Sequence, residues 1–163
     1  MSISFDNTVL NHPLLLSPGL NIRYNRTLLQ QKVQSISVLG SFGLISTPQT
    51  DNRLVFGLGG EYAVHFLKRF SIATGIQANY VLTALKYDVF EYNSEGNWEN
   101  RGNLLHNFSP GMHLSLQGDF VQRDLFKMGA FLELRMLRLN ESYEKKWLQG
   151  YVPIFSIGIK SNF

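Results

Sequence analysis

The sequence predicts an all-β fold, an eight-stranded antiparallel up-and-down transmembrane β-barrel in which residues 1–163 form a single domain. Three observations carry this prediction. Apolar residues alternate with small or polar residues in one segment after another, as they do on the two faces of a strand. The connections between these segments alternate between short and longer, as in successive hairpins. The last segment, Tyr151–Phe163, continues the alternation to the end of the sequence.

Composition narrows the class of protein. With 163 residues the chain is long enough for one closed barrel but too short for a barrel and a second folded domain. No stretch approaches the roughly 18 consecutive apolar residues of a membrane helix, whereas barrel strands need only alternate apolar residues. The absence of cysteine excludes a disulfide framework and a thiol nucleophile. The net charge of +3 is scattered, so no nucleic-acid surface is predicted.

The first half of the chain contains four predicted strands, and Leu54–Phe66 alternates most clearly of all. The other three are Ser2–Leu10, Gly19–Leu28 and Val33–Ser46. Ser2–Leu10 alternates only briefly and is included for a reason of parity. Seven strands are well marked, single-chain bacterial barrels use even numbers of strands, and the last strand needs a partner at the N-terminus to close the sheet.

The second half contains the strands Phe70–Tyr87, Leu105–Val121, Phe126–Leu139 and Tyr151–Phe163. Phe70–Tyr87 is longer than the roughly 9–11 residues that cross a bilayer, so it should project beyond the membrane. Asp88–Asn103 is the longest polar connection and is predicted to be a loop, as is the charged segment Asn140–Gly150. Proline removes a donor from the strand ladder, so a bulge is expected at Pro110.

The apolar face of each strand is predicted to point outward. A soluble barrel with an apolar interior is the alternative, but an eight-stranded barrel has room inside only for its own side chains. The opposite face is rich in Gly, Ser, Asn and Gln, which suit a crowded lumen. Its charged residues should pair with one another, since buried charges persist only when they are paired. This predicted internal network comprises Arg23, Glu61, Asp119, Glu133, Arg135 and Lys160, with Lys127 on the same face.

The final strand has Phe155, Ile157, Ile159 and Phe163 on one face. In this it resembles the small eight-stranded outer-membrane β-barrels of Gram-negative bacteria, whose assembly signal is a last strand with alternate apolar residues and a terminal Phe. The resemblance implies a location in the outer membrane and contact with its lipid and lipopolysaccharide. It also implies recognition by the barrel-assembly machinery, and other outer-membrane proteins are candidate partners. The chain starts without a basic and apolar leader, so the export signal is expected to have been removed.

The same resemblance implies an orientation. The termini and the short turns Gln30–Lys32, Leu67–Arg69 and Gln122–Asp124 would lie on the periplasmic side, and the longer loops would lie outside. Aromatic residues would then gather at both interfaces, as in the family. One girdle comprises Phe66, Phe70, Phe120, Phe126 and Phe163, and the other comprises Tyr87, Tyr143, Trp147 and Tyr151.

Two classes of function remain after these considerations. The first is a non-enzymatic structural or interaction protein, for instance an accessory subunit of a larger outer-membrane complex. Aromatic residues in the outer loops would anchor its partner; the candidates are Tyr92, Trp98, Tyr143 and Trp147, which could instead rest at the lipid headgroups. The second is a lipid A-modifying enzyme.

The enzyme alternative depends on His113 and Ser115, which are similar to the His-x-Ser pair of outer-membrane lipid A deacylases. Leu116 stands where that family has Asn, and the pair lies in the middle of a strand. Because Met112 and Leu114 should face lipid, His113 and Ser115 should face the lumen, out of reach of an acyl chain. No catalytic residue is therefore assigned. His65 and His106 have no ligand partner at a recognisable spacing, so neither a metal nor a cofactor is predicted.

Overall fold

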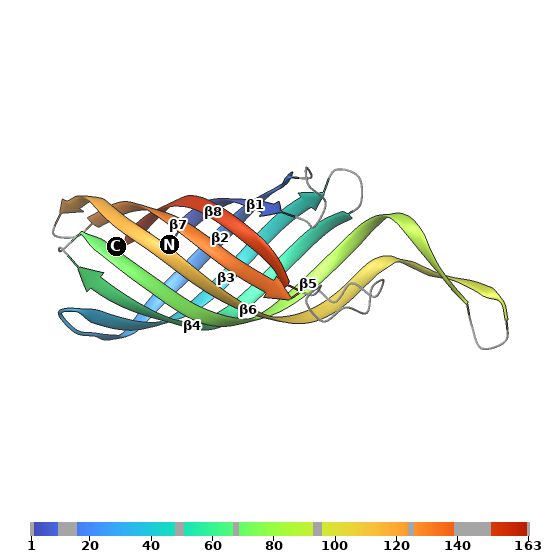
Figure 1. Cartoon of the computed structure of the whole chain (residues 1–163), viewed down its shortest axis with the longest axis horizontal. Helices are drawn as coiled ribbons and strands as arrows, with labels where there is room; N and C mark the ends of the chain where they lie inside the picture. Colours follow the sequence, from blue (N-terminus) through green and yellow to red (C-terminus); the bar gives the residue numbers. More distant parts are fainter. Residues whose placement is uncertain are drawn as a thin grey trace.

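The computed structural model of the chain is a closed barrel in which eight antiparallel strands follow one another in chain order (Figure 1). The structure describes residues 2–9, 16–47, 51–66, 69–92, 96–123, 126–138 and 151–162. The strands are β1 (Ser2–Val9), β2 (Leu16–Gln30), β3 (Gln34–Thr47), β4 (Asp51–Phe66), β5 (Phe70–Tyr92), β6 (Trp98–Arg123), β7 (Phe126–Arg138) and β8 (Tyr151–Asn162). The predicted fold class is confirmed. None of the described residues belongs to a helix long and apolar enough to cross a membrane.

The barrel closes between its first and last strands. β1 pairs with β2 on one side and with β8 on the other, so Phe5 lies opposite Leu20 and also opposite Ile157. The parity argument therefore identified a real strand, and only its last predicted residue, Leu10, lies outside the described residues. Closure gives the first and last strands a partner on both sides, which matters because lipid cannot hydrogen-bond a strand edge.

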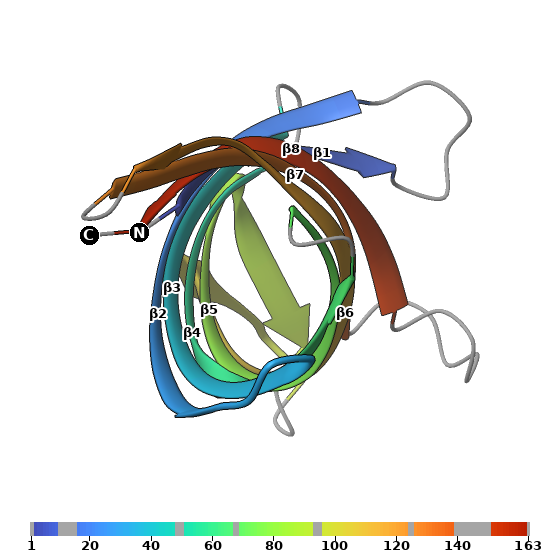
Figure 2. The same cartoon turned by 90° about the vertical axis from the view of Figure 1, so that its left-hand side faces the viewer.

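The strands are tilted, as the shift in pairing register around the barrel shows. The row of paired residues that starts at Ser35 on β3 returns to β3 at Ile45, ten residues farther along. The row runs through Ser35, Ala63, Ala73, Ser115, Glu133, Ser156, Asp6, Gly19 and Ile45. Tilt of this kind lets side chains from strands that are not neighbours meet across the narrow lumen. Figure 2 looks along the barrel from the end where both termini lie.

The two faces of the strands point as predicted. On β6, Met112 and Leu114 are exposed on the outer surface while His113 and Ser115 are buried inside. β7 repeats this pattern, because Leu132 is exposed and Glu133 is buried. The inner face is too crowded for larger residues at several glycines. A Cβ atom added to Gly59 would overlap the backbone oxygen of Ile76, and one added to Gly57 would meet the side-chain oxygens of Ser41 and Asn79.

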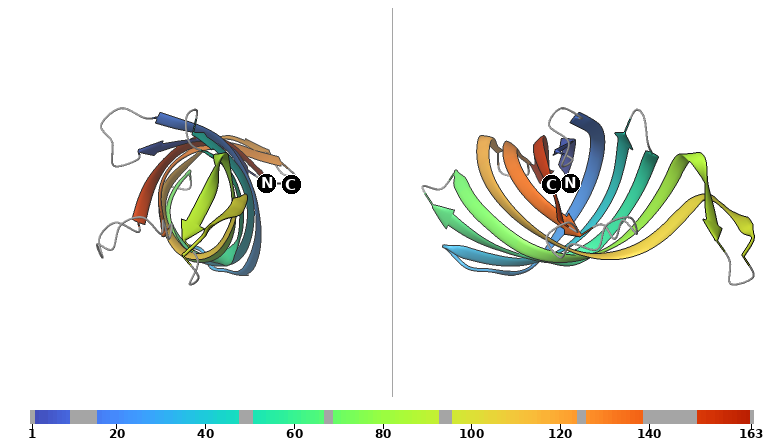
Figure 3. Two further views of the ribbon diagram at one scale, coloured as in Figure 1. Left: turned by 90° about the vertical axis from the view of Figure 1, so that its right-hand side faces the viewer. Right: turned by 45° about the vertical axis from the view of Figure 1, so that its right-hand side comes forward.

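The segment Asp88–Asn103 differs from its prediction as a loop. β5 continues to Tyr92 and β6 already begins at Trp98, so most of this segment is a two-stranded ribbon, here called the arm (residues 86–92 and 96–103). The arm extends well beyond the rest of the barrel (Figure 3). Its end of the molecule is called the arm end, and the opposite end, with both termini and the short turns, the terminus end. The pairing shifts between Ala84 and Val89, where the ribbon bends away from the barrel.

Some boundaries and one irregularity were also predicted wrongly. β2 begins at Leu16 and β4 at Asp51, both inside segments predicted as connections. The bulge expected at Pro110 is absent, because the pairing of β5 with β6 passes through Ala78 and Pro110 without a shift. On the other side of β6, pairing with β7 starts only at Gly111. A proline next to the end of that pairing removes little from the ladder, which explains why no bulge forms.

Candidate functional sites in the lumen and the arm

The centre of the lumen holds a cluster of paired charges. The guanidinium of Arg23 on β2 lies against the carboxylate of Glu133 on β7, with Nη1 2.5 Å from Oε2 and Nη2 2.6 Å from Oε1. Arg135, two residues farther along β7, places its own Nη2 2.8 Å from Glu133 Oε1. All three side chains are buried. Glu133 is thus held by two arginines, in the arrangement that a buried carboxylate requires.

A second carboxylate extends the cluster across the lumen. Glu61 Oε2 on β4 lies 3.8 Å from Arg23 Nη1 and 3.0 Å from His113 Nε2 on β6. Glu61 Oε1 accepts a hydrogen bond of 3.2 Å from the side-chain amide of Asn25. Sequence reasoning placed His113 in the lumen but did not connect it to Glu61, because their strands are not neighbours. The alternation that puts both side chains inside was the one signal available for this contact.

The remaining predicted lumen residues form a separate group near the terminus end. Lys160 Nζ on β8 lies 2.8 Å from Asp119 Oδ1 on β6 and donates a hydrogen bond of 3.0 Å to Gln117 Oε1. The six predicted residues therefore lie inside the barrel but in two groups. Lys127 was also predicted to face the lumen, and it lies on the same face of β7 as Glu133, in neither of the two groups. It is exposed where β7 begins, at the terminus end, because the lumen no longer encloses a long side chain there.

Between the charges and the arm end the lumen is filled by apolar side chains. This apolar cluster consists of Ile45, Val55, Val81, Leu137 and Ile154, contributed by β3, β4, β5, β7 and β8. Each of these side chains is almost completely buried. Beyond the cluster, at the arm end, Arg53 and Asp51 pair at 2.6 Å. Of the five residues of the apolar cluster, only Val55 was predicted to face inward. The other four were not assigned to a face, because segments such as Met136-Leu137 are apolar on both faces.

This arrangement determines what the lumen can do. A solute channel needs a continuous water-filled path, whereas here apolar side chains from five strands meet across the bore. On the side of this cluster that faces the terminus end, the charged groups pair with one another. These ion pairs hold β2, β4, β6 and β7 together across the lumen. Their arrangement supports a stabilising role for the charges.

His113 and Ser115 do not form the pair that a nucleophilic enzyme requires. His113 Nε2 is directed to Glu61, and Ser115 Oγ accepts a hydrogen bond of 3.0 Å from Gln117 Nε2. Within the described part of the chain, no hydrogen bond joins the two side chains. Both are buried in the lumen, so an acyl chain in the bilayer cannot reach them.

The arm presents the second candidate site. Near its tip the rings of Tyr92 and Trp98 pack edge to face, with centroids 5.2 Å apart and planes at 75°. They nevertheless remain 65% and 69% exposed, so most of their apolar surface has no cover. Tyr87 and Phe90 on β5 are exposed as well. Tyr92 and Trp98, predicted to lie in a loop, are strand residues, while the other two predicted anchors, Tyr143 and Trp147, lie outside the described residues.

Neither edge of the arm is paired with a further strand among the described residues. Pairing of β4 with β5 ends at Asp51 and Leu85, and pairing of β6 with β7 begins at Gly111 and Leu137. In the described ranges, therefore, neither side of the ribbon has a third strand. An unpaired edge offers backbone N–H and C=O groups to an incoming strand.

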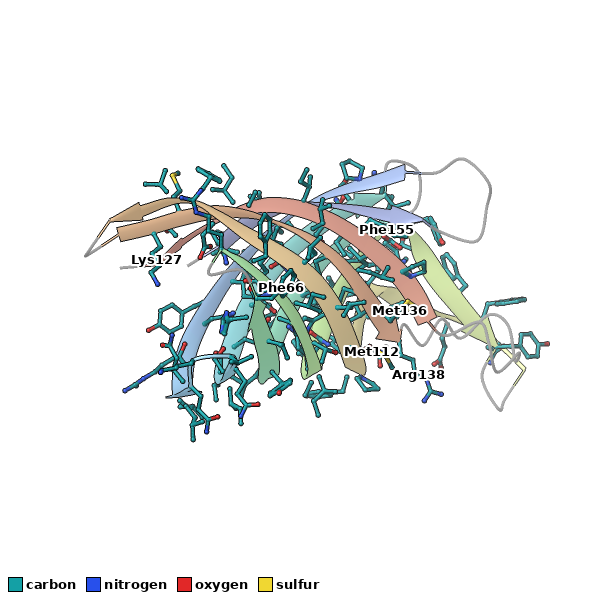
Figure 4. The ribbon with its side chains drawn as sticks, turned by 60° about the vertical axis from the view of Figure 1, so that its left-hand side comes forward. Phe66, Met112, Lys127, Met136, Arg138 and Phe155 are labelled. Carbon is teal, nitrogen blue, oxygen red and sulfur yellow. The ribbon has the colours of Figure 1, made fainter. Side chains whose placement is uncertain are left out.

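The residues assigned to the assembly signal are mostly on the outer surface. Phe155, Ile157 and Ile159 are exposed on the outer face of β8, and Figure 4 labels Phe155 on that strand, while Phe163 lies outside the described residues. At the terminus end Phe66 and Phe70 stack with centroids 6.1 Å apart. This pair belongs to the predicted girdle on that side. Tyr87 of the other girdle is exposed at the base of the arm.

Comparison with solved structures identifies proteins of the same shape. The outer-membrane enzyme PagL matches with a TM-score of 0.50 and 10% identity, over 99% of this chain and 98% of PagL. Ail, the attachment invasion locus protein of Yersinia pestis, matches with a TM-score of 0.50 and 12% identity, over 99% of this chain and 95% of Ail. No protein-family model and no curated protein sequence matches the chain. At these identities the likeness concerns the fold alone.

Proposed function

Because the chain has the fold of the small eight-stranded outer-membrane β-barrels, we propose that it is a non-enzymatic interaction protein that binds a partner through its arm. Its outer surface is apolar, as a protein embedded in the outer membrane requires, and its lumen is occupied by paired charges and an apolar cluster. In the orientation implied by its resemblance to this family, the arm extends outside the cell and the termini face the periplasm.

The observation that carries this proposal is the combination of exposed aromatic rings and unpaired strand edges on the arm. Tyr92 and Trp98 are of the residue types that most often anchor protein interfaces. A partner that adds a strand to the ribbon would satisfy its edge and cover these rings at the same time. The partner we expect is thus another envelope or external protein with an extended segment, and the barrel serves as its membrane anchor. Ail, described as an attachment protein, is an analogy at the level of the fold only.

Capture of partners from membranes in a mild detergent tests this function. The wild-type chain should retain a second protein, and the double variant Tyr92→Ala/Trp98→Ala should lose it. Removal of one anchoring ring typically weakens binding by about 2 kcal/mol, or roughly thirtyfold. Phe120→Ala is the matched control, because Phe120 is an exposed aromatic residue far from the arm. If the wild-type chain always migrates alone, or if the control loses the partner equally, the arm is not the binding site.

Catalysis on lipid A is the other function to be tested. The positions of His113 and Ser115 in the lumen give it no support. Mass spectrometry of lipid A from cells with and without the protein should therefore give identical acyl compositions. A deacylated species that appears with the wild-type chain and disappears with Ser115→Ala would contradict the non-enzymatic proposal and the lumenal role of this pair.

A further inference from the structure

The outer surface of the barrel contains a hollow of about 500 Å³ that crosses β4, β5 and β6. Its floor is formed at Gly60, Ala78 and Pro110, where small side chains leave the backbone uncovered. Its walls are Leu58, Ile76 and Met112, which lie on the same outer face. Because these six residues lie on the outer face of their strands, the hollow is on the bilayer side of the sheet.

The register explains why the surface is hollow at this place. Ala78 lies between Leu58 on β4 and Pro110 on β6, and Gly60 lies opposite Ile76. Leu58 and Ile76 are 66% and 73% exposed, so they stand clear of the surface on either side of the small residues. The barrel itself does not require the glycine. The nearest atom to a Cβ at Gly60 would be the backbone oxygen of Ser37 at 3.9 Å, whereas a Cβ at the neighbouring Gly59 would overlap the backbone.

A polar pair borders the hollow on the side of the arm end. Tyr80 follows Ala78 on the outer face of β5, and its hydroxyl is hydrogen-bonded to Nδ1 of His106 on β6. Phe108 packs against the Tyr80 ring, with centroids 5.2 Å apart. His106 is exposed, which is unusual for a polar residue on an otherwise apolar outer face. Along the outer surface, from the middle of the barrel toward the arm end, an apolar hollow is thus followed by hydrogen-bonding groups.

This order of apolar and polar surface matches a lipid whose headgroup lies at the arm end. Apolar contacts inside a bilayer gain no hydrophobic free energy, since lipid tails are as apolar as leucine. Close packing still stabilises the complex, because the residues that line an empty space lack dispersion contacts on that side. An acyl chain seated between Leu58, Ile76 and Met112 would restore those contacts. The Tyr80–His106 pair could at the same time hydrogen-bond the oxygens where chain and headgroup join.

We propose that this hollow binds one acyl chain of lipid A, the lipid of the outer leaflet, with Tyr80 and His106 at its polar end. The choice of leaflet rests on the orientation given under the proposed function. The site itself is independent of the arm, since no hollow residue belongs to it.

Native mass spectrometry of the barrel, extracted from outer membranes in a mild non-ionic detergent, tests the proposal. The wild-type chain should retain lipid A. Gly60→Leu and Ala78→Leu should each reduce the retained fraction at least roughly tenfold, because each fills the hollow with a side chain of the size that natural lipid-facing residues have. Tyr80→Phe keeps the ring and removes the hydroxyl, so it should reduce retention by about fivefold.

Gly40→Leu is the matched control. Gly40 is on the outer face of β3, no atom lies within 4 Å of its Cβ position, and it is separated from the hollow by Leu58. This variant should retain as much lipid A as the wild-type chain. A gel shift between unboiled and boiled samples verifies that each variant has folded, and partner capture through the arm should be unchanged in all of them.

Three results would overturn the proposal. The first is a wild-type chain that carries no lipid A. The second is that the Gly60→Leu and Ala78→Leu variants fold and carry as much lipid A as the wild type. The third is that the wild-type chain retains a glycerophospholipid in place of lipid A. A loss of lipid A in Gly40→Leu equal to that in Gly60→Leu would likewise show that the hollow is not the site. None of these results depends on whether the arm binds a partner, so the two proposals can fail separately.

Discussion

The body of the barrel and the arm are built from the same two strands but differ in how many partners those strands have. In the body, β5 is paired with β4 and β6, and β6 with β5 and β7. In the arm, β5 and β6 pair only with each other among the described residues. The body buries most of its inner face, whereas the arm has no interior and exposes the rings of Tyr92 and Trp98. Stability and, by our proposal, recognition are therefore located in different parts of one hairpin.

The largest effect should come from the central charges of the body. Glu133→Ala would leave Arg23 and Arg135 buried without their shared carboxylate, which should lower the free energy of unfolding by about 3–5 kcal/mol. Urea unfolding in lipid vesicles measures this change. Lys127→Ala, on the same strand but exposed, is the control and should leave the transition in place. Equal transitions for the Glu133 variant and the wild type would mean that the charges contribute nothing to the body.

A slightly smaller effect is expected from the apolar cluster. Leu137→Ala would open a cavity where five strands meet and should lower the free energy of unfolding by about 2–5 kcal/mol. Leu132→Ala removes the same atoms from the same strand on the lipid side, where lipid can fill the space. The same urea titration should show a clear difference between the two variants. If they are equally destabilised, the cluster packs no better than lipid does.

Two adjacent glycines give a finer test of the packing inside the body. Gly59→Ala would push a methyl group into the backbone of β5 and should lower the free energy of unfolding by about 1–3 kcal/mol. Gly60→Ala adds the same group on the outside, where there is space, and should have almost no effect. Parallel unfolding curves compare the two. An equal loss of stability in both variants would contradict the inward and outward facing of this strand.

The smallest effect on stability should come from the arm. Replacement of residues 88–102 by a short Gly-Ser link should change the free energy of unfolding by less than about 0.5 kcal/mol, because among the described residues this segment adds no strand pairing to β4 or β7. The shortened chain should still migrate faster on a gel before boiling than after. Loss of that shift would show that the arm helps to close the barrel, and the division between the two regions would be wrong.

The alternation of residue types was enough to predict most of the body. It assigned Met112 and Leu132 to the lipid side and His113 and Glu133 to the lumen, because a strand places neighbours on opposite faces. Parity supplied β1, whose own pattern was weak. Contacts across the lumen were not predictable in detail. The pairing of Glu61 with His113 depends on strand tilt, which brings together residues far apart in sequence.

The arm was missed for a different physical reason. A ribbon with both faces in water has no apolar side, so Asp88–Asn103 shows no alternation and was predicted to be a loop. The apolar cluster was missed because Leu137 follows the apolar Met136 and Ile154 precedes the apolar Phe155. Where both faces are apolar, period two cannot say which residue points inward. The Pro110 bulge was expected from the residue alone, without knowledge of where pairing with β7 begins.

The apolar cluster has a consequence for the acidity that the central carboxylates experience. It lies between Glu61 and Glu133 on one side and the arm end on the other, so protons from the arm end would have to pass apolar side chains from five strands to reach these carboxylates. With the arm outside the cell, the interior of the barrel would equilibrate with the periplasm and not with the surroundings.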